Sequence, residues 1–250
     1  MITTLGVVVT AAAVAGATAY VNRSVPPPPE PTPTPGSGFE PAVRRIPKCG
    51  QSYAIGRTLD PQTEAAELLS IDRGGPSFDD FLQRQHASPI GTITIEIVFT
   101  GRLQRPTRIL DVRVARLETT QNLAGTELRT YCGGDPPARA VELDLDTPPR
   151  ALISDKKPYF DGRDLDVTVE QRETLRISAS ARLHGYRWVF AIDHIDGSGV
   201  TVTSYLDANG GLYQDIAQVP DDAEFSLTGA AKTYGVRYQE SGGRFYQDAS

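Results

Sequence analysis

The sequence predicts a mainly β protein, an antiparallel immunoglobulin-like β-sandwich with two short N-terminal helices, preceded by a transmembrane or signal helix and a proline-rich linker. Apolar residues recur at every second position in several short stretches, as half-buried strands require. Turn-forming Gly, Asp and Asn separate these stretches, and no helical pattern alternates with them. The chain has 250 residues, 39% of them hydrophobic, which is enough for one sizeable core. A distorted barrel is the alternative architecture.

The first element is an uncharged run over residues 1–21, long enough to cross a hydrocarbon core of about 30 Å. It is rich in Ala, Thr and Gly, and Ala17-Thr18-Ala19 also fits a signal-peptidase site. Two outcomes are therefore open: a single-pass anchor in the cell membrane, or secretion after cleavage near Ala19. The positive charge of Arg23 favours a cytoplasmic C-terminal side. The linker and the cysteines described below favour an extracytoplasmic body, which is the expectation we adopt.

Residues 22–38 form the second element, a linker dominated by proline. Proline fixes φ and favours the extended polyproline helix, so the segment reads as a semi-rigid stalk that ends in the flexible Gly36-Ser37-Gly38. A ligand for a proline-binding domain is the alternative interpretation. Residues 39–250 then make up the β-sandwich domain.

Two short helices are expected at the start of this domain. The first has Asp60 as N-cap, Pro61 at the first helical position and a run over residues 62–71. The second begins at Ser77, where Ser77 and Asp80 resemble a capping box. Its Phe78, Phe81 and Leu82 share one apolar face. Both helices are expected to cover the sheet locally.

The strands follow from residue 91 onwards, each with apolar residues at alternate positions. They are expected at 93–99, 110–114, 141–145, 165–169, 175–183, 188–192, 200–206 and 212–216, with a further short strand at 127–131. Strands 175–183 and 188–192 are expected to pair as a hairpin through a short turn at His184. Strands 200–206 and 212–216 flank an Asn-Gly turn, which predicts a second hairpin. Trp188 is expected in the core, and the aromatic residues after 233 are either an exposed contact surface or a last strand with a tail.

Three of these segments and one turn are considered together: the segments lie around Gly91-Thr92-Ile93, Arg108-Ile109-Leu110 and Tyr186-Arg187-Trp188, and the turn is at Asp207. They resemble a group of uncharacterised, membrane-anchored actinobacterial proteins with a β-rich extracytoplasmic domain. The resemblance covers about residues 75–217 and rests on structural motifs. It implies a location outside the cytoplasmic membrane and carries no activity, cofactor or site residue.

Charge excludes some partners. The formal net charge is −6, and the chain has no basic stripe with interleaved aromatic residues, so nucleic-acid binding is not expected. The sequence also lacks HExxH, CxxC, GxSxG and a phosphate-binding glycine loop. No cofactor is therefore expected.

The remaining candidates for chemistry are scattered. Three histidines, His86, His184 and His194, lack metal-ligand spacing. Acidic residues gather in two predicted turns, Asp161, Asp164 and Asp166 in the first and Asp193 and Asp196 in the second. Their carboxylates are ligands of the kind that calcium binds. The common occurrence of aspartate in turns explains them as well. We therefore expect no metal site and keep these five aspartates as weak candidates.

Cys49 and Cys132 are the only cysteines, and a disulfide between them is expected if the domain lies in an oxidising compartment. Two buried thiols in a cytosolic protein are the alternative. These observations together favour a non-catalytic cell-envelope module, attached to the membrane by its N-terminal helix, that binds a protein or a cell-wall component. The alternative functions are an extracytoplasmic hydrolase and a structural subunit of a membrane assembly. For the hydrolase we expect a pocket that holds His184 or His194 beside Asp193 and Asp196.

Overall fold

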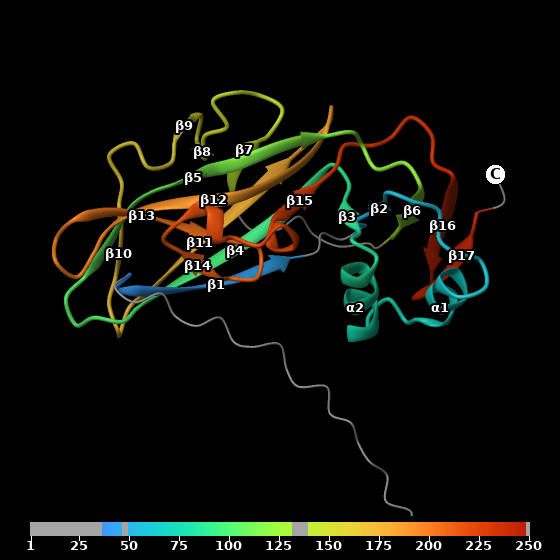
Figure 1. Ribbon diagram of the computed structural model, residues 1–250, viewed down its shortest axis with the longest axis horizontal. Coiled ribbons are helices and arrows are strands. Elements are labelled where there is room, and N and C mark those ends of the chain that lie inside the picture. Colours follow the sequence, from blue (N-terminus) through green and yellow to red (C-terminus); the bar gives the residue numbers. More distant parts are fainter. Residues whose placement is uncertain (1–36, 47–49, 132–139, 249–250) are drawn as a thin grey trace, which may run out of the picture. The chain divides into compact units, whose positions relative to one another are not determined.

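The computed structural model describes residues 37–46, 50–131 and 140–248. The predicted transmembrane or signal helix, nearly all of the linker and both cysteines lie outside these residues. Within them the protein is mainly β, as predicted, with three sheets and two α-helices. Figure 1 shows their arrangement.

The six strands of the first sheet run in the order β1 (Phe39–Ile46), β4 (Thr92–Gly101), β11 (Arg172–Ser180), β7 (Val141–Asp144), β8 (Ile153–Ser154) and β9 (Lys157–Pro158). The sheet is mixed: β7 and β11 pair in parallel, and the other pairs are antiparallel. The N-terminal strand β1 was not predicted, because its apolar alternation is interrupted by Arg44 and Arg45.

The second sheet is antiparallel throughout. Its strands are β10 (Leu165–Val167), β5 (Thr107–Thr120), β12 (Gly185–Ile195), β13 (Thr201–Leu206) and β14 (Leu212–Tyr213), with β15 (Phe225–Leu227) also paired to β12. The hairpin β13–β14 confirms the one predicted across residues 207–211, with β14 shorter than expected. Two 3₁₀ turns, Ile216–Gln218 and Asp221–Ala223, lie between β14 and β15.

These two sheets share one hydrophobic core, to which β4 and β11 of the first sheet and β5 and β12 of the second contribute alternate residues. Trp188 lies fully buried in it, as predicted, and stacks on Phe225 with ring centroids 5.6 Å apart. The sandwich begins earlier than predicted: Ser37 is buried, and Thr107 Oγ1 donates to the carbonyl of Gly38. The end of the predicted linker therefore belongs to the folded body.

The predicted hairpin between 175–183 and 188–192 is wrong. Strand β11 pairs with β4 and β7, whereas β12 pairs with β5, β13 and β15, so the chain crosses from one sheet to the other at residues 181–184. Asp146 supports this crossing, because its carboxylate accepts hydrogen bonds from the amides of Arg182 and Leu183 and from the hydroxyl of Tyr186. A side chain remote in sequence thus satisfies the amides that a hairpin partner would have satisfied.

The third sheet and both helices enclose a second, smaller core. The strands of this small sheet are β17 (Arg244–Gln247), β16 (Val236–Ser241), β6 (Thr126–Arg129), β2 (Tyr53–Ile55) and β3 (Ser88–Pro89). Figure 1 shows helices α1 (Glu64–Ser70) and α2 (Pro76–Arg84) beside these strands. The helices therefore cover the small sheet rather than the sandwich. Tyr238 and Phe245 are buried in this core, and Tyr246 is exposed. The C-terminal aromatic residues therefore belong to strands, as one of the two interpretations held, but they form two paired strands rather than one last strand with a tail.

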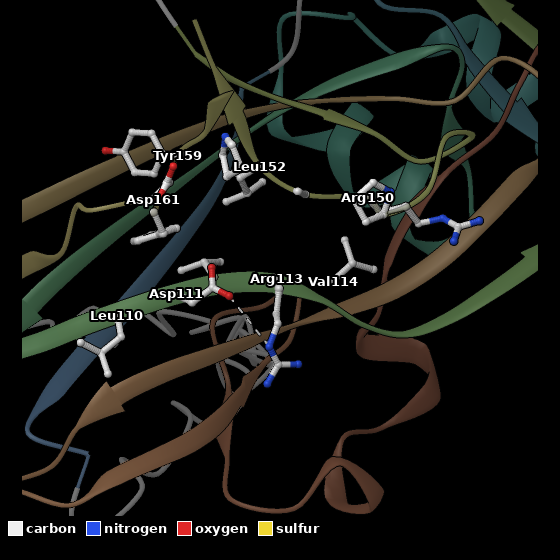
Figure 2. Close-up of a pocket in the computed structure, with 13 residues that line it drawn as sticks. Leu110, Asp111, Arg113, Val114, Arg150, Leu152, Tyr159 and Asp161 are labelled. Atoms are coloured by element: carbon white, nitrogen blue, oxygen red, sulfur yellow. Dashed lines mark ion pairs between the residues drawn. The ribbon is translucent and has the colours of Figure 1, made fainter. Parts of the chain in front are cut away.

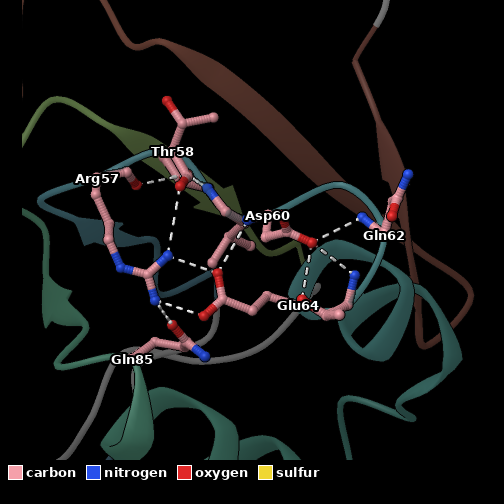
Figure 3. A network of polar contacts seen from close by, with 9 residues as sticks. Arg57, Thr58, Asp60, Gln62, Glu64 and Gln85 are labelled. Atoms are coloured by element: carbon pink, nitrogen blue, oxygen red, sulfur yellow. Dashed lines mark hydrogen bonds and ion pairs between the residues drawn. The ribbon is translucent and has the colours of Figure 1, made fainter.

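The helix starts differ from the prediction. Helix α1 begins at Glu64, and Asp60 caps the turn before it: its carboxylate accepts from the amides of Gln62 and Thr63 (Figure 3). Glu64 in turn pairs with both guanidinium nitrogens of Arg57, at 2.5 and 2.6 Å, and this contact lowers the pKa of Glu64 to about 2.

Helix α2 begins at Pro76 after Gly75, with no side-chain cap, so the predicted Ser77–Asp80 capping box is absent. Proline has no backbone N–H, so at the first helical position it leaves no donor without a hydrogen-bond partner. A helix start at Pro76, one residue before the predicted start at Ser77, is therefore favourable. The predicted apolar face is confirmed, since Phe78, Phe81 and Leu82 are all buried.

Candidate functional site

A cleft of about 590 Å³ lies along β5 of the second sheet (Figure 2). One wall is formed by five successive residues of β5, and the other by the chain segment between β7 and β10. The lining residues are Leu110, Asp111, Val112, Arg113, Val114, Pro149, Arg150, Ala151, Leu152, Pro158, Tyr159, Phe160 and Asp161. The cleft is open to solvent along one side and mixes apolar with charged side chains.

The β5 wall is an unpaired strand edge. One edge of β5 pairs with β12 along almost its whole length. On the other edge β10 pairs only with residues 107–109, and no described strand continues beside residues 110–114. Leu110 has no partner in the β5–β12 register, which shifts between Asp193 and His194, so β5 carries a bulge where the cleft starts.

The opposite wall is a short, turn-rich segment. Strands β8 and β9 form a two-residue hairpin in which Asp155 and Lys156 both have positive φ, 51° and 67°, as a type I′ turn requires. Directly after it, the rings of Tyr159 and Phe160 pack edge to face with centroids 5.0 Å apart. Arg163 lies over the Tyr159 ring at 4.7 Å. Proline and aromatic side chains thus give this wall a rigid apolar surface.

Asp111 is the polar centre of the β5 wall. Burial raises the pKa of its carboxyl, and the neighbouring charge of Asp193 adds to this effect. The cation nearest to Asp111 is Arg113, at 4.0 Å. Arg113 binds the carboxylate of Asp193 more closely, at 3.2 and 3.3 Å, and Asp193 also accepts a hydrogen bond from Thr203. Asp111 therefore keeps a carboxyl group without a close cation.

The lining combines apolar and charged side chains. It includes the carboxylates of Asp111 and Asp161 and the hydroxyl of Tyr159, and it contains no His, Ser, Thr, Cys or Lys. Extended apolar surface, two aromatic rings and a few charged groups are what a binding cleft needs to hold a ligand and orient it.

The predicted acidic clusters are taken up by turns and ion pairs. Asp164 and Asp166 both face Arg108, at 3.6 and 3.1 Å. Asp196 accepts from the amides of Ser198 and Val200 across its turn. Asp161 alone of the predicted acidic residues lines the cleft. In the described part of the chain, no three His, Cys, Asp or Glu side chains are grouped so that they could hold a metal ion.

The turn after β13 shows the same use of an aspartate. The buried carboxylate of Asp207 accepts from the amides of Asn209 and Gly211, at 2.9 and 2.7 Å, and from the hydroxyl of Tyr213 at 2.9 Å. Burial and this hydrogen bond raise the pKa of Tyr213 to about 12. The Asp/Gly loop is thus stabilised internally, as turn chemistry predicts.

The histidines do not meet in a site. His86 and His184 are exposed, whereas His194 is fully buried between the sheets. Its Nε2 lies 3.0 Å from the hydroxyl of Ser204, and its ring contacts Phe39 at 4.9 Å. The pocket expected for a hydrolase, with His184 or His194 beside Asp193 and Asp196, does not correspond to the cleft, whose lining includes none of these four residues.

Acid is expected to destabilise the protein through His194. Burial lowers the pKa of its imidazole below the usual 6.5, and this effect outweighs the opposing charges of Asp196 and Asp193. Above about pH 6.5 the imidazole is neutral in both states, whereas below it the unfolded chain binds the additional proton. The free energy of unfolding should therefore fall as the pH is lowered from 7 towards 5.

Urea unfolding of His194→Gln and of the control His184→Gln, at pH 7.5 and 5.0, tests this expectation. The loss on acidification should shrink in His194→Gln and persist in His184→Gln. Equal losses in both variants would assign the acid sensitivity to other groups.

Comparisons with known proteins add no relative: no protein-family model, curated protein or solved structure matches the chain. In the described residues, no helix has the length and apolar character needed to cross a membrane. The predicted membrane helix lies outside those residues.

Most of the cleft was not predicted. Leu110 and Val114 were identified only as strand residues, and Tyr159 and Phe160 were not singled out. The one sequence signal for this wall is the dense run of prolines, an Asp-Lys turn and two adjacent aromatic residues over 148–160. Such a run marks a rigid segment but does not say which strand it faces.

Proposed function

We propose that this protein is a non-catalytic cell-envelope binding module, held at the membrane by its N-terminal segment, that binds a partner protein or wall component in the cleft along β5. The observation that carries the proposal is the cleft itself, which combines an unpaired strand edge with a rigid apolar wall. The apolar N-terminal run and the proline-rich linker of the sequence support the location.

The immunoglobulin-like type of sandwich is part of the same proposal. A tryptophan buried at the centre of the core and the antiparallel second sheet support it. The parallel pair β7–β11 departs from the all-antiparallel pattern of that fold. The proposed domain is therefore an immunoglobulin-like sandwich whose first sheet includes one parallel pair.

Filling the cleft should abolish partner capture. Ala151 lines the cleft and is partly exposed, so Ala151→Arg places a long side chain in the opening without emptying the core. Cross-linking in intact envelopes, followed by affinity purification and mass spectrometry, should recover a partner with the wild type and at least tenfold less with this variant.

The matched control is Ala230→Arg, the same substitution at an exposed position outside the cleft lining. It should capture the partner as the wild type does. Equal recovery by both variants would show that the cleft is not the binding site, and measurable turnover in a hydrolase screen with no captured partner would replace the proposal by an enzyme.

The proposed location makes a separate prediction. Protease added outside intact cells should cut within residues 22–40 and release the folded body as one stable fragment, because proline-rich linkers are accessible and the body is compact. A cytoplasmic marker protein serves as the control for lysis. Protection of the chain until the cells are lysed would place the domain in the cytoplasm.

A further inference from the structure

We propose that the cleft takes up an extended, positively charged peptide segment of the partner, which adds to the second sheet as a strand along residues 110–114 of β5. This inference rests on the proposed binding function and names the chemistry of the partner. Its basis is the unpaired edge of β5 together with two carboxylates of the cleft, Asp111 and Asp161, that have no close cation.

The strand edge supplies the first argument. In an antiparallel ladder successive residues direct their N–H and C=O groups to opposite sides, so β12 pairs with alternate residues of β5 only. On the other edge of β5 no described strand pairs with residues 110–114, so alternate residues of this stretch present their backbone N–H and C=O groups to the cleft. An extended peptide backbone complements such groups in spacing and direction.

The opposing wall leaves room for such a strand and limits it to a few residues. Five lining residues of β5 span about 17 Å at roughly 3.4 Å each. Leu152, Tyr159 and Phe160 provide apolar contacts for side chains on one face of the added strand. The site therefore suits a short segment of about five residues with apolar residues at alternate positions.

The charges of the cleft select a basic peptide. Neither arginine of the lining makes a close ion pair with Asp111 or Asp161: Arg113 binds Asp193, and Arg150, whose Nε donates to the carbonyl of Leu145 at 2.8 Å, keeps its positive charge at the end of the cleft away from Asp161 (Figure 2). Figure 2 shows the Arg113 guanidinium on the side of β5 away from the opposite wall. Asp111 has its nearest cation at 4.0 Å, and Asp161 forms no ion pair with a described residue. A Lys or Arg side chain of the peptide would neutralise these carboxylates.

The chain's own proline-rich segment is a poor occupant. Residues 25–35 are mostly proline, which has no amide to donate to the free edge, and carry Glu30 but no basic residue. A peptide from another protein, with free amides and basic side chains, fits both features of the cleft.

The test uses a fluorescent heptapeptide of alternating valine and lysine, titrated into the full chain in detergent. Saturable binding is expected, with amide chemical-shift changes within residues 110–114 of β5. The same peptide N-methylated at its three central residues should bind on the order of tenfold more weakly, because two or more backbone hydrogen bonds are lost. A peptide with glutamate in place of lysine should also bind at least about tenfold more weakly.

Two protein variants complete the test. Asp111→Asn keeps the shape of the side chain and should weaken binding of the lysine peptide about fivefold and reduce its salt dependence. Asp222→Asn, at an exposed position outside the cleft lining, should bind as the wild type does. Equal affinity for the N-methylated peptide, or for the glutamate peptide, would overturn strand addition or charge selection respectively. If the peptides fail while Ala151→Arg still abolishes partner capture, the inference is wrong and the binding function stands.

Discussion

Replacing Cys132 by serine should lower the free energy of unfolding by at most about 4–5 kcal/mol, the value that chain entropy assigns to a cross-link closing the long loop from Cys49 to Cys132. Strain and residual structure in the unfolded chain reduce this figure. Even half of it is a large part of the ~5–15 kcal/mol by which domains of this kind are stable.

The described residues beside the cysteines support the predicted disulfide. Strands β2 and β6 pair antiparallel, with Tyr53 opposite Leu128 and Ile55 opposite Thr126. Next to this ladder, Thr130 Oγ1 donates to the carbonyl of Gln51. The described residues that are nearest in sequence to the two cysteines therefore lie side by side. The two cysteines themselves lie outside the described residues, so the bond remains a prediction.

Chemical denaturation of the wild type with and without reductant, and of Cys49→Ser, Cys132→Ser and the double variant, checks this prediction. All three variants and the reduced wild type should show the same loss, because each lacks the same bond. Alkylation before and after reduction, read by mass spectrometry, provides the control. Two thiols that react before reduction would rule out the disulfide and would remove one support for an oxidising compartment.

The second large effect is expected at Arg116, and Arg116→Met should cost about 3 kcal/mol of unfolding free energy. Arg116 has a positive φ of 42° in β5, which aims its guanidinium at the segment between β14 and β15. Its Nε lies 2.8 Å from the carboxylate of Glu224, which is only 6% exposed, and Nη1 donates to the carbonyl of Val219 at 2.9 Å. Removal of the arginine leaves a buried carboxylate with one remaining partner, Arg187.

The matched control is Arg182→Met, which breaks the exposed ion pair between Arg182 and Asp144 at 3.3 Å. An exposed pair of this kind contributes less than about 1 kcal/mol. Urea denaturation midpoints of both variants decide the comparison. Similar losses in the two variants would show that Arg116 does not hold the β14–β15 segment onto the sheet.

The candidate site was largely beyond sequence reasoning. Strand 110–114 was predicted from its alternating apolar residues, but nothing local indicates that β10 stops pairing with β5 at Ile109. Edge exposure depends on where a remote strand ends. From the sequence, Asp111 and Arg113 could be identified only as residues on the polar face of a strand. Their proximity to Asp193 depends on the register between β5 and β12, which places Asp193 opposite Asp111.

The sequence by itself determined the mainly β character of the domain, the position of its central strands, the apolar face of α2 and the burial of Trp188. These features depend on local periodicity and on side-chain hydrophobicity, which the chain carries at each position. Tertiary structure alone decided the partner of each strand, the separate small core around α1 and α2, and the cleft along β5. Asp146 shows the physical reason: the crossing between β11 and β12 depends on a carboxylate far away in sequence, and such pairings leave no local pattern.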